Sequence, residues 1–331
     1  MDSPRLSQAE LAVTSTAVAG DTGTLYYIVA GLLDEGIPLE TVLFDLLIPT
    51  AAHIGRRWQQ GDYLISEEHA ATAALETVVS MLAGSFDQPE GGLHVVVATV
   101  EGDAHSLPAR AAAAYLLFLG YRTTFLGASV PAPDLKEYLA EEVPTAALLS
   151  SAMTMHLPAA RAAIKASHET GVPVIVGGRA FGEGGRWAPA VGADAWVGSP
   201  REVAAVLESW DPNPVGSEAG ARDSLEELTA LRQSRPLIVA EAYSDVARAF
   251  SEAGAGRLLS EVGLLVGSLE GAVLVGDPEA LVETLLWQRE TLVAHGISAQ
   301  EALVGAVRSH LDGSFPTSRT VLDRAVEAAG I

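Results

Sequence analysis

Apolar residues follow two different spacings along this chain. From about residue 7 to residue 86 they recur every three or four positions, in four stretches separated by Gly and Pro. That spacing is typical of amphipathic helices, and four of them predict a helical bundle. From Leu93 onward the apolar residues come instead in short runs without strict alternation. Such runs are typical of parallel strands that are buried on both faces.

Five of these runs alternate with helical stretches, at 93–100, 123–128, 146–153, 172–178 and 195–199. Five β–α units predict a Rossmann-like, doubly wound parallel sheet, which binds ligands at the carboxyl ends of its strands. A Pro-, Gly- and Ser-rich stretch follows, and the remaining residues are again helical in pattern. The predicted fold class is therefore multidomain α and α/β. Its parts are an N-terminal four-helix bundle (1–88), the sheet domain (89–212), a linker (213–223) and an all-helical domain (224–331).

Two helical segments resemble each other, 17–47 and 272–307. Each has a helix end, a Gly-Asp pair, a long helix, a Gly-Ile turn and another helix. Two interpretations stay open: the C-terminal domain is a second bundle on the plan of the first, or alanine-rich helical hairpins look alike by chance.

Charge and composition exclude several classes of partner. The 331 residues include 42 acidic and 20 basic ones, for a formal net charge of −22. This charge opposes binding to nucleic acids and to anionic membranes. The chain has no cysteine, so disulfides, thiolate metal sites and thioether-linked cofactors are excluded. The polar start and the absence of a long uninterrupted apolar stretch lead us to expect no signal peptide, no membrane span and a cytoplasmic location.

A histidine follows the first predicted strand, in the segment Gly102-Asp103-Ala-His105. A lone loop histidine is commonly just a solvated polar residue. Asp103, however, can accept a proton from one imidazole nitrogen and leave the other free for a metal. One histidine without cysteine is too few ligands for a structural zinc site. A single axial imidazole instead suits a metal that a macrocycle already holds.

These residues resemble the Asp-x-His-x-x-Gly signature of cobalamin-binding domains, in which the histidine is the lower axial ligand of cobalt. The resemblance implies that His105 binds the metal and that Asp103 orients it. It also implies that small residues after the third and fourth strands flank the nucleotide tail of the cofactor, with Thr154 close by. The residues at these positions are Ser150, Ser151, Gly177 and Gly178. Pro108 departs from the signature, because it stands where the family has glycine.

A second pattern, WQQGDYLISEEH at 58–69, lies in the predicted bundle. Ser66 is a good N-cap for the following helix, whose first turn would contain Glu68 and His69. Taken alone, this is an ordinary helix end and helix start. Trp58 followed after nine residues by Glu68-His69, ahead of a cobalamin domain, resembles the signature of adenosylcobalamin-dependent photoreceptors. The resemblance covers about two thirds of the chain and implies that Trp58 and Glu68 cover the upper face of the corrin and contact the adenosyl group.

Two departures from that family affect the functional prediction. Before the bundle we find no helix-turn-helix, so we expect no DNA binding. The family's histidine after the Trp, which captures cobalt after photolysis, is replaced here by Gln59. A bis-histidine photoproduct would need His69 or His53 instead, or water would occupy the upper face.

The C-terminal helices carry a few polar or aromatic residues that are either ordinary surface positions or parts of a second ligand site. An extra helical region beside a cobalamin domain resembles the photocobilins, which also bind a bilin. Arginines would pair with its propionates, and without cysteine a bilin such as biliverdin must be noncovalent. The candidates are Trp287, Arg289, His295, Arg308 and His310.

The leading functional prediction is a non-enzymatic light sensor that holds adenosylcobalamin (cobalt) and signals through self-association, as a homo-oligomer, or through a partner protein. A switch of this kind needs a contact that differs between its two states. The alternatives are a corrinoid methyl-carrier protein of a methyltransferase system and a light-independent, cobalamin-responsive regulator. A mutase subunit is less favoured, because no substrate barrel follows from the sequence.

Overall fold

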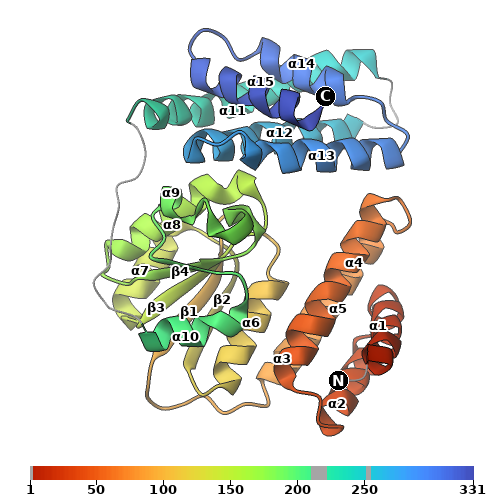
Figure 1. Cartoon of the computed structure of the whole chain (residues 1–331), viewed down its shortest axis with the longest axis vertical. Coiled ribbons are helices and arrows are strands. Elements are labelled where there is room, and N and C mark those ends of the chain that lie inside the picture. Colours follow the sequence, from red (N-terminus) through yellow and green to blue (C-terminus); the bar gives the residue numbers. More distant parts are fainter. Residues whose placement is uncertain (1–2, 210–221, 251–254) are drawn as a thin grey trace.

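The computed structural model describes residues 3–209, 222–250 and 255–331. In Figure 1 they form an N-terminal helical bundle, a central sheet with helices around it, and a C-terminal group of helices above both. This arrangement confirms the predicted fold class. Most of the predicted linker lies outside the described residues, and the first C-terminal helix already begins at Arg222.

The N-terminal bundle is formed by α1 (Ser3–Val18), α2 (Thr22–Asp34), α3 (Leu39–Thr41), η1 (Val42–Leu47), α4 (Ile48–Gln59) and α5 (Ile65–Ala83). The elements α3, η1 and α4 follow one another without a break, and η1 is a π-helical segment in which the Ile48 N–H donates to the Leu43 carbonyl. It ends two residues before Pro49, which has no N–H to contribute to a regular helical ladder. The core of the bundle also includes Leu107 and Ala111, from the first helix of the sheet domain.

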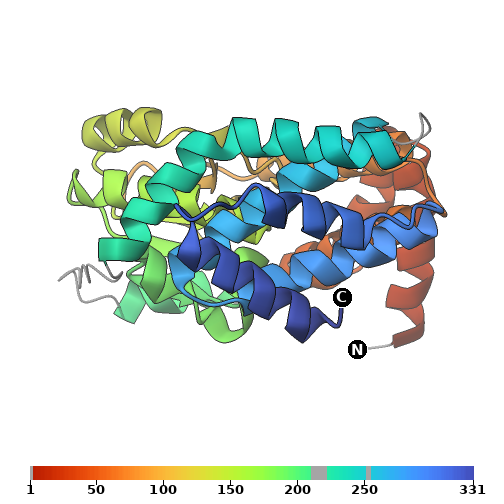
Figure 2. The same ribbon diagram turned by 90° about the horizontal axis from the view of Figure 1, so that it is seen from above.

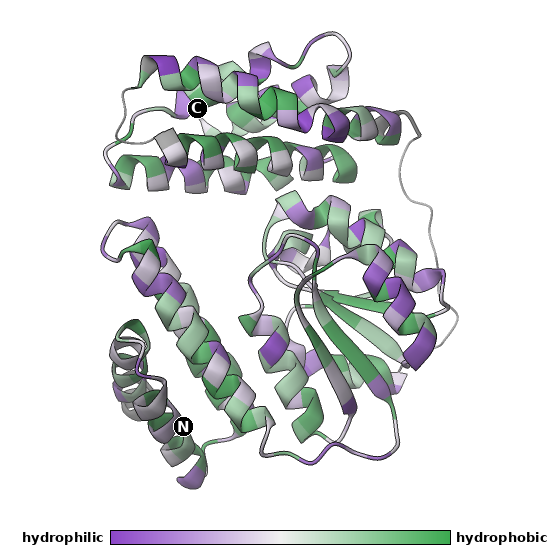
Figure 3. Ribbon diagram, turned by 180° about the vertical axis from the view of Figure 1, so that it is seen from behind, coloured by the Kyte–Doolittle hydropathy of each residue, from purple (hydrophilic) through white to green (hydrophobic). Residues whose placement is uncertain are grey.

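The central sheet is parallel throughout and has the strand order β2-β1-β3-β4-β5. Its strands are β1 (His94–Val100), β2 (Arg122–Val130), β3 (Ala146–Ser150), β4 (Val174–Gly177) and β5 (Ala195–Val197). The strands carry mostly hydrophobic residues (Figure 3), as expected for a sheet covered on both faces. The direction in which strands are added reverses between β1 and β3, and this reversal opens a crevice at their carboxyl ends where ligands bind in such folds.

Helices surround the sheet on both faces (Figure 1). They are α6 (Leu107–Phe118), α7 (Ala132–Glu142), η2 (Thr154–His156), α8 (Leu157–His168), η3 (Arg179–Phe181), η4 (Glu183–Gly185), α9 (Ala188–Val191), η5 (Pro200–Glu202) and α10 (Val203–Ser209). The sequence pattern did not predict four of these short elements, namely η2, η3, η4 and α9.

The C-terminal helices lie across both the sheet domain and the bundle (Figure 2). They are α11 (Arg222–Ala249), α12 (Ala255–Val275), α13 (Glu279–Ala294), α14 (Gln300–Ser309) and α15 (Pro316–Ala329). By length and composition alone, α12 could cross a membrane, but 72% of its apolar window is buried inside the protein. Such burial is what the core helix of a helical domain shows.

The two segments that resemble each other in sequence also share their turns. Gly20 and Gly276 both have φ of +68°, and Asp21 and Asp277 follow them and accept hydrogen bonds from the next helix. The helix after the turn has 13 residues in the first segment and 16 in the second. The shared geometry favours a common plan for the two domains, which stays a hypothesis.

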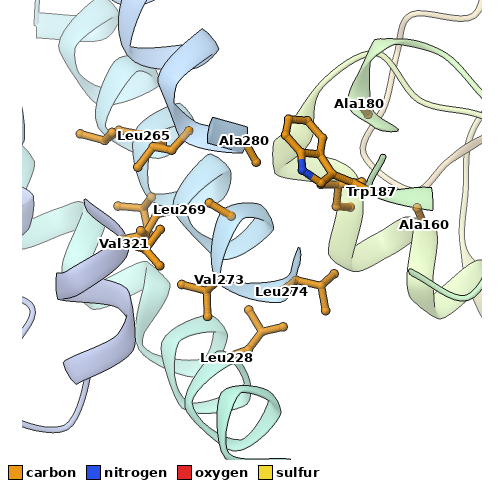
Figure 4. Close-up of a cluster of buried hydrophobic side chains, with 14 of the residues drawn as sticks. Ala160, Ala180, Trp187, Leu228, Leu265, Leu269, Val273, Leu274, Ala280 and Val321 are labelled. Carbon is orange, nitrogen blue, oxygen red and sulfur yellow. The ribbon is translucent and has the colours of Figure 1, made fainter. Parts of the chain in front are cut away.

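The C-terminal domain and the sheet domain share one hydrophobic core. In Figure 4 the side chains of α12, among them Leu269, Val273 and Leu274, lie between Leu228 of α11 and the sheet-domain residue Trp187. Trp187 is 4% exposed. The C-terminal domain is therefore packed onto the sheet domain rather than attached only by chain connectivity.

Candidate functional site

The loop after β1 holds its histidine in one orientation. The Nδ1 atom of His105 lies 2.7 Å from Oδ1 of Asp103, and the His105 backbone N–H donates to the same oxygen at 3.0 Å. Asp103 is fully buried, whereas the His105 side chain is 56% exposed. Because Nδ1 is occupied, Nε2 is the nitrogen left to face a ligand. The predicted orienting pair is thus present.

Asp103 also joins the loop after β1 to the loop after β3. Its Oδ2 accepts hydrogen bonds from the Ala152 backbone N–H at 2.6 Å and from the Ser151 hydroxyl at 3.2 Å. Burial alone would raise the pKa of Asp103, but hydrogen bonds from His105 and Ala152 outweigh burial and hold the pKa at about 2. The hydrogen bond to this carboxylate raises the pKa of His105, against the effect of its own partial burial.

Three polar contacts shape the loop itself. The Thr99 hydroxyl donates to the Asp103 carbonyl at 2.6 Å and accepts from the Ser129 N–H at 2.8 Å. The Ser129 hydroxyl in turn accepts from the Gly102 N–H at 2.9 Å. Gly102 has φ of +85°, and a Cβ there would lie 3.2 Å from the ring of His156. Glycine is therefore needed for both the turn and the close approach of this ring.

The loops after β3 and β4 meet where the sequence placed small residues. Ser150 pairs with Gly177 in the sheet, and the Ser151 N–H donates to the Gly177 carbonyl at 3.0 Å. Gly178 has φ of +105°, and a Cβ there would lie only 2.1 Å from the Ser151 carbonyl oxygen. No other residue fits this position without moving the backbone.

The residues predicted for the opposite wall come from the α4–α5 hairpin of the bundle. Trp58 is half-buried near the end of α4, and Glu68 is half-buried in the first turn of α5. The Glu68 carboxylate lies close enough to His105 to help raise the pKa of that imidazole. Glu68 of the bundle thus lies within electrostatic range of His105 in the sheet domain, although 37 positions in the chain separate them.

Three details of this hairpin differ from the sequence-based expectations or limit the candidates. The helix begins at Ile65, so Ser66 is not its N-cap; Glu67 accepts from the Leu64 N–H at 2.7 Å instead. The ring of His69 is 72% exposed and its Nδ1 is bonded to Glu68 at 2.7 Å. His53 lies five residues before Trp58 on α4, which places the two on different sides of that helix.

Several residues near the loops after β1 and β3 were not predicted from the sequence, and one predicted residue is less exposed than expected. Thr154 is buried, with its carbonyl oxygen against Gly271 of α12. His156, which was not predicted, is 9% exposed, and burial lowers its pKa. Its position soon after β3, at the ligand-binding edge of the sheet, was the signal that could have identified it. Arg179, in η3, and Arg235, in α11, are near enough to lower the pKa of His105 and His156 respectively.

The candidate residues of the C-terminal domain do not converge on one site. Arg289 donates to the Ala329 carbonyl, Arg308 pairs with Asp323 at 2.7 Å, and His295 bonds to the Thr291 carbonyl. The ring of His310 lies between the carboxylates of α11, at 3.1 Å from Glu241 and 2.8 Å from Asp245. Trp287 alone among these candidates faces the bundle, where its ring lies 5.9 Å from that of Trp58.

The donor set fits a metal that arrives inside a macrocycle. Within the described ranges, no group of three or more His, Asp or Glu side chains could hold a bare metal ion. His105 supplies one imidazole, half exposed and fixed by a buried carboxylate, at the crevice between β1 and β3. One such ligand is sufficient only when other donors already occupy the equatorial positions of the metal.

Comparison with protein families agrees with this chemistry. Residues 93–208 and residues 12–83 match two family models, both described as a B12 binding domain. The first match contains the whole sheet, and the second contains most of the bundle. The chain therefore carries cobalamin-binding domains, and the C-terminal helices lie outside both matches.

Individual relatives are of two kinds. The HTH-type transcriptional repressor CarH of Myxococcus xanthus is 32% identical over 112 residues, which are 32% of this chain and 36% of CarH. Trimethylamine corrinoid protein 1 of Methanosarcina acetivorans is 25% identical over 158 residues, which are 45% of this chain and 72% of that protein. The structure of the Methanosarcina barkeri monomethylamine corrinoid protein superimposes on 62% of this chain and 99% of its own, with a TM-score of 0.52 and 18% identity. This last likeness shows the fold alone.

Proposed function

We propose that this cobalamin-binding chain is a light sensor that carries adenosylcobalamin between its sheet domain and its helical bundle. The observation that carries the proposal is the pairing of a buried Asp103 with a half-exposed His105, opposite the Glu68 carboxylate of the bundle. We assign the lower wall of the cofactor site to the loop after β1 and the upper wall to the α4–α5 hairpin, as the two resemblances imply. The match to part of CarH supports the same assignment.

Each residue of the site has a physical task in this proposal. When bound, adenosylcobalamin supplies a cobalt–carbon bond that visible light breaks. Asp103 keeps the Nδ1 proton on His105 and so presents a neutral, basic Nε2 to cobalt. The nucleotide tail would lie among the small or polar residues after β3 and β4, namely Ser150, Ser151, Thr154, Gly177 and Gly178. The adenosyl side would be covered by Trp58, Glu68 and His69.

The output of the sensor would be a change in assembly. Loss of the adenosyl group would remove whatever contacts it had with the bundle, and the bundle could then shift against the sheet domain. Self-association or a partner protein would read this shift. A noncovalent bilin, such as biliverdin, is proposed as a second chromophore only on the resemblance to photocobilins. Because the predicted C-terminal candidates are mostly bonded within their own domain, other side chains would have to hold it.

A corrinoid methyl carrier is the second candidate function, and the likeness to trimethylamine corrinoid protein 1 favours it. A carrier needs a cap that opens for its methyltransferase and an upper ligand no larger than a methyl group. A light-independent regulator is the third candidate, and it would bind its partner in the dark according to whether cobalamin is present.

The deciding experiment is illumination of the full chain loaded with adenosylcobalamin in the dark. A sensor should show a permanent change of its absorption spectrum and a change of oligomeric state by size-exclusion chromatography. His105→Ala should lose the spectrum of the imidazole-ligated cobalt, whereas His168→Ala, at a histidine bonded to Asp194, should keep it. A spectrum that His105→Ala leaves unchanged would refute the site. Methyl transfer with a methyltransferase, and no response to light, would establish the carrier instead.

A further inference from the structure

The tip of the bundle touches the C-terminal domain. The ring of Trp58 lies 5.9 Å from that of Trp287 on α13, with 39° between the ring planes. The Gln59 side-chain amide donates to Glu290 of the same helix at 3.1 Å. A Cβ on Gly61 would lie 3.4 Å from the Ala294 carbonyl oxygen. These contacts involve the residue predicted to cover the upper face of the corrin and its immediate neighbours.

The opposite end of the bundle is bonded directly to the sheet domain. Tyr115 of α6 donates to Glu40 at 2.8 Å, and Arg201 pairs with Asp45 at 2.7 Å. Further along α5, the Ser80 hydroxyl accepts from Arg110 at 2.8 Å. In Figure 1, the bundle runs from this bonded base up to α13. Its tip is the end that moves furthest if the bundle tilts.

The C-terminal domain is in turn fixed on the sheet domain. Gly271 of α12 lies so close to η2 that a Cβ there would be 2.1 Å from the Thr154 carbonyl oxygen, and Gly267 packs against Met155. The Trp187 indole N–H donates to Asp277, between α12 and α13, at 2.9 Å. Helix α13 therefore has a defined position relative to the β3 loop and, through it, relative to Asp103 and His105.

We infer that the C-terminal domain sets the separation between the two walls of the cofactor pocket, and that Trp287 is the positioning residue for Trp58. This inference rests on the proposed function. In this proposal Trp287 acts through Trp58 and does not itself contact the cofactor. It holds the Trp58 indole at the separation from the sheet domain that a large upper ligand needs. The match to B12 binding domains ends at residue 208, so this role belongs to a part of the chain that the family does not supply.

The test compares two corrinoids that differ only in their upper ligand. Dissociation constants for adenosylcobalamin and methylcobalamin are measured in the dark on the full chain, and their ratio is the readout. Trp287→Ala should reduce the preference for adenosylcobalamin by about two- to twelvefold, which is what an aromatic pair contributes. Trp287→Phe should retain most of the preference, because a ring still faces Trp58. Val293→Ala, at a side chain 67% exposed on the same helix, is the matched control and should change nothing.

Every outcome decides the inference. If Trp287 has a purely structural role, Trp287→Ala would weaken the binding of both corrinoids equally and leave the ratio of dissociation constants unchanged. That result would refute the inference while the proposed function stands. A wild-type chain that binds neither corrinoid overturns the proposed function and the inference with it. If Trp287→Ala does not fold, Glu290→Ala replaces it. Glu290 is exposed, so its loss removes the bond to Gln59 without opening the core, and it should lower the same ratio.

Discussion

Replacement of Asp103 by asparagine tests the site before any cofactor is added. Asparagine keeps the shape of the side chain but removes its charge and turns one acceptor into an N–H₂ donor. In the native chain one carboxylate oxygen serves His105 twice, and the other accepts from Ala152 and Ser151. Whichever way the new amide is oriented, its NH₂ group faces a donor that had an acceptor before. Asp103→Asn should therefore loosen the β1 and β3 loops together.

The magnitude follows from the pKa of the carboxyl group. Its fall from 3.8 to about 2 in the folded chain is worth about 2 kcal/mol of stability near neutral pH. A backbone N–H left without an acceptor costs about 1–3 kcal/mol more. Because the folded chain lowers the pKa of Asp103, the stability that this carboxylate contributes is present above pH 3.8 and is lost as pH falls toward 2.

The His105 imidazole determines how stability changes at the alkaline side of the pH profile. The folded chain raises the pKa of His105 above 6.5. The stability that the protonated imidazole contributes is therefore fully present below pH 6.5 and is lost as pH rises through the raised pKa. The stability difference between wild type and Asp103→Asn should therefore be largest at about pH 5–6 and shrink in both directions. Asp103→Asn should also lower the pKa of His105 itself.

Urea denaturation followed by circular dichroism, repeated from pH 3 to pH 8, measures the difference, and NMR titration follows the His105 ring. Asp87→Asn, at an exposed loop carboxylate, is the control and should be neutral at every pH. A difference below about 0.5 kcal/mol at pH 5.5, or an unchanged pKa of His105, would contradict the account of how this loop is held.

Two further substitutions test how the domains are joined. Gly271→Ala should destabilise the chain by about 1–3 kcal/mol in urea denaturation, because the new methyl group meets the Thr154 carbonyl oxygen at 2.1 Å. Gly263→Ala, on the same helix with open space around it, should be neutral or slightly stabilising, and equal effects would refute the close packing. Tyr115→Phe should lower the free energy of unfolding by about 1 kcal/mol, because it removes the hydrogen bond to Glu40. A double-mutant cycle with Glu40→Gln tests this bond, and no coupling between the two changes would show that the bond does not stabilise the interface.

The sequence was sufficient to predict the helices and strands whose buried residues recur at a regular spacing. The strands are buried on both faces, so their apolar runs identify them, and a strand followed by a loop histidine places that histidine at the binding edge of the sheet. The predicted start of α5 was two residues too late. The Glu67 carboxylate accepts a hydrogen bond from the Leu64 N–H at the start of the helix, where the sequence had predicted a Ser66 cap. Local pattern predicts that a helix starts, but not which of two nearby polar side chains caps it.

The missing parts of the site come from contacts between distant segments. Ser129 and His156 support the loop of Asp103 from β2 and from η2, and neither stands in a recognisable motif. Arg235 reaches the vicinity of His156 only because α12 leaves space for it at Gly267, where a Cβ would lie 2.9 Å from its guanidinium. Such placements follow from how domains pack, and a single sequence does not encode that packing as a pattern.

The contact between Trp58 and Trp287 also bears on which of the proposed functions is physically suited to this chain. An aromatic pair contributes about 0.5–1.5 kcal/mol and an exposed hydrogen bond such as Gln59–Glu290 about as much, so together they hold the tip by about 1–3 kcal/mol. A ligand whose contacts differ by a few kcal/mol between two states can reverse an equilibrium of that size. In the proposed function, an adenosyl group that rested against the bundle in the dark and was absent after illumination would supply such a difference. A methyl group has far less surface with which to do so, and a carrier would have to break the same contacts in every cycle without that contribution. The strength of this small interface therefore favours a switch that is operated by the loss of a large upper ligand.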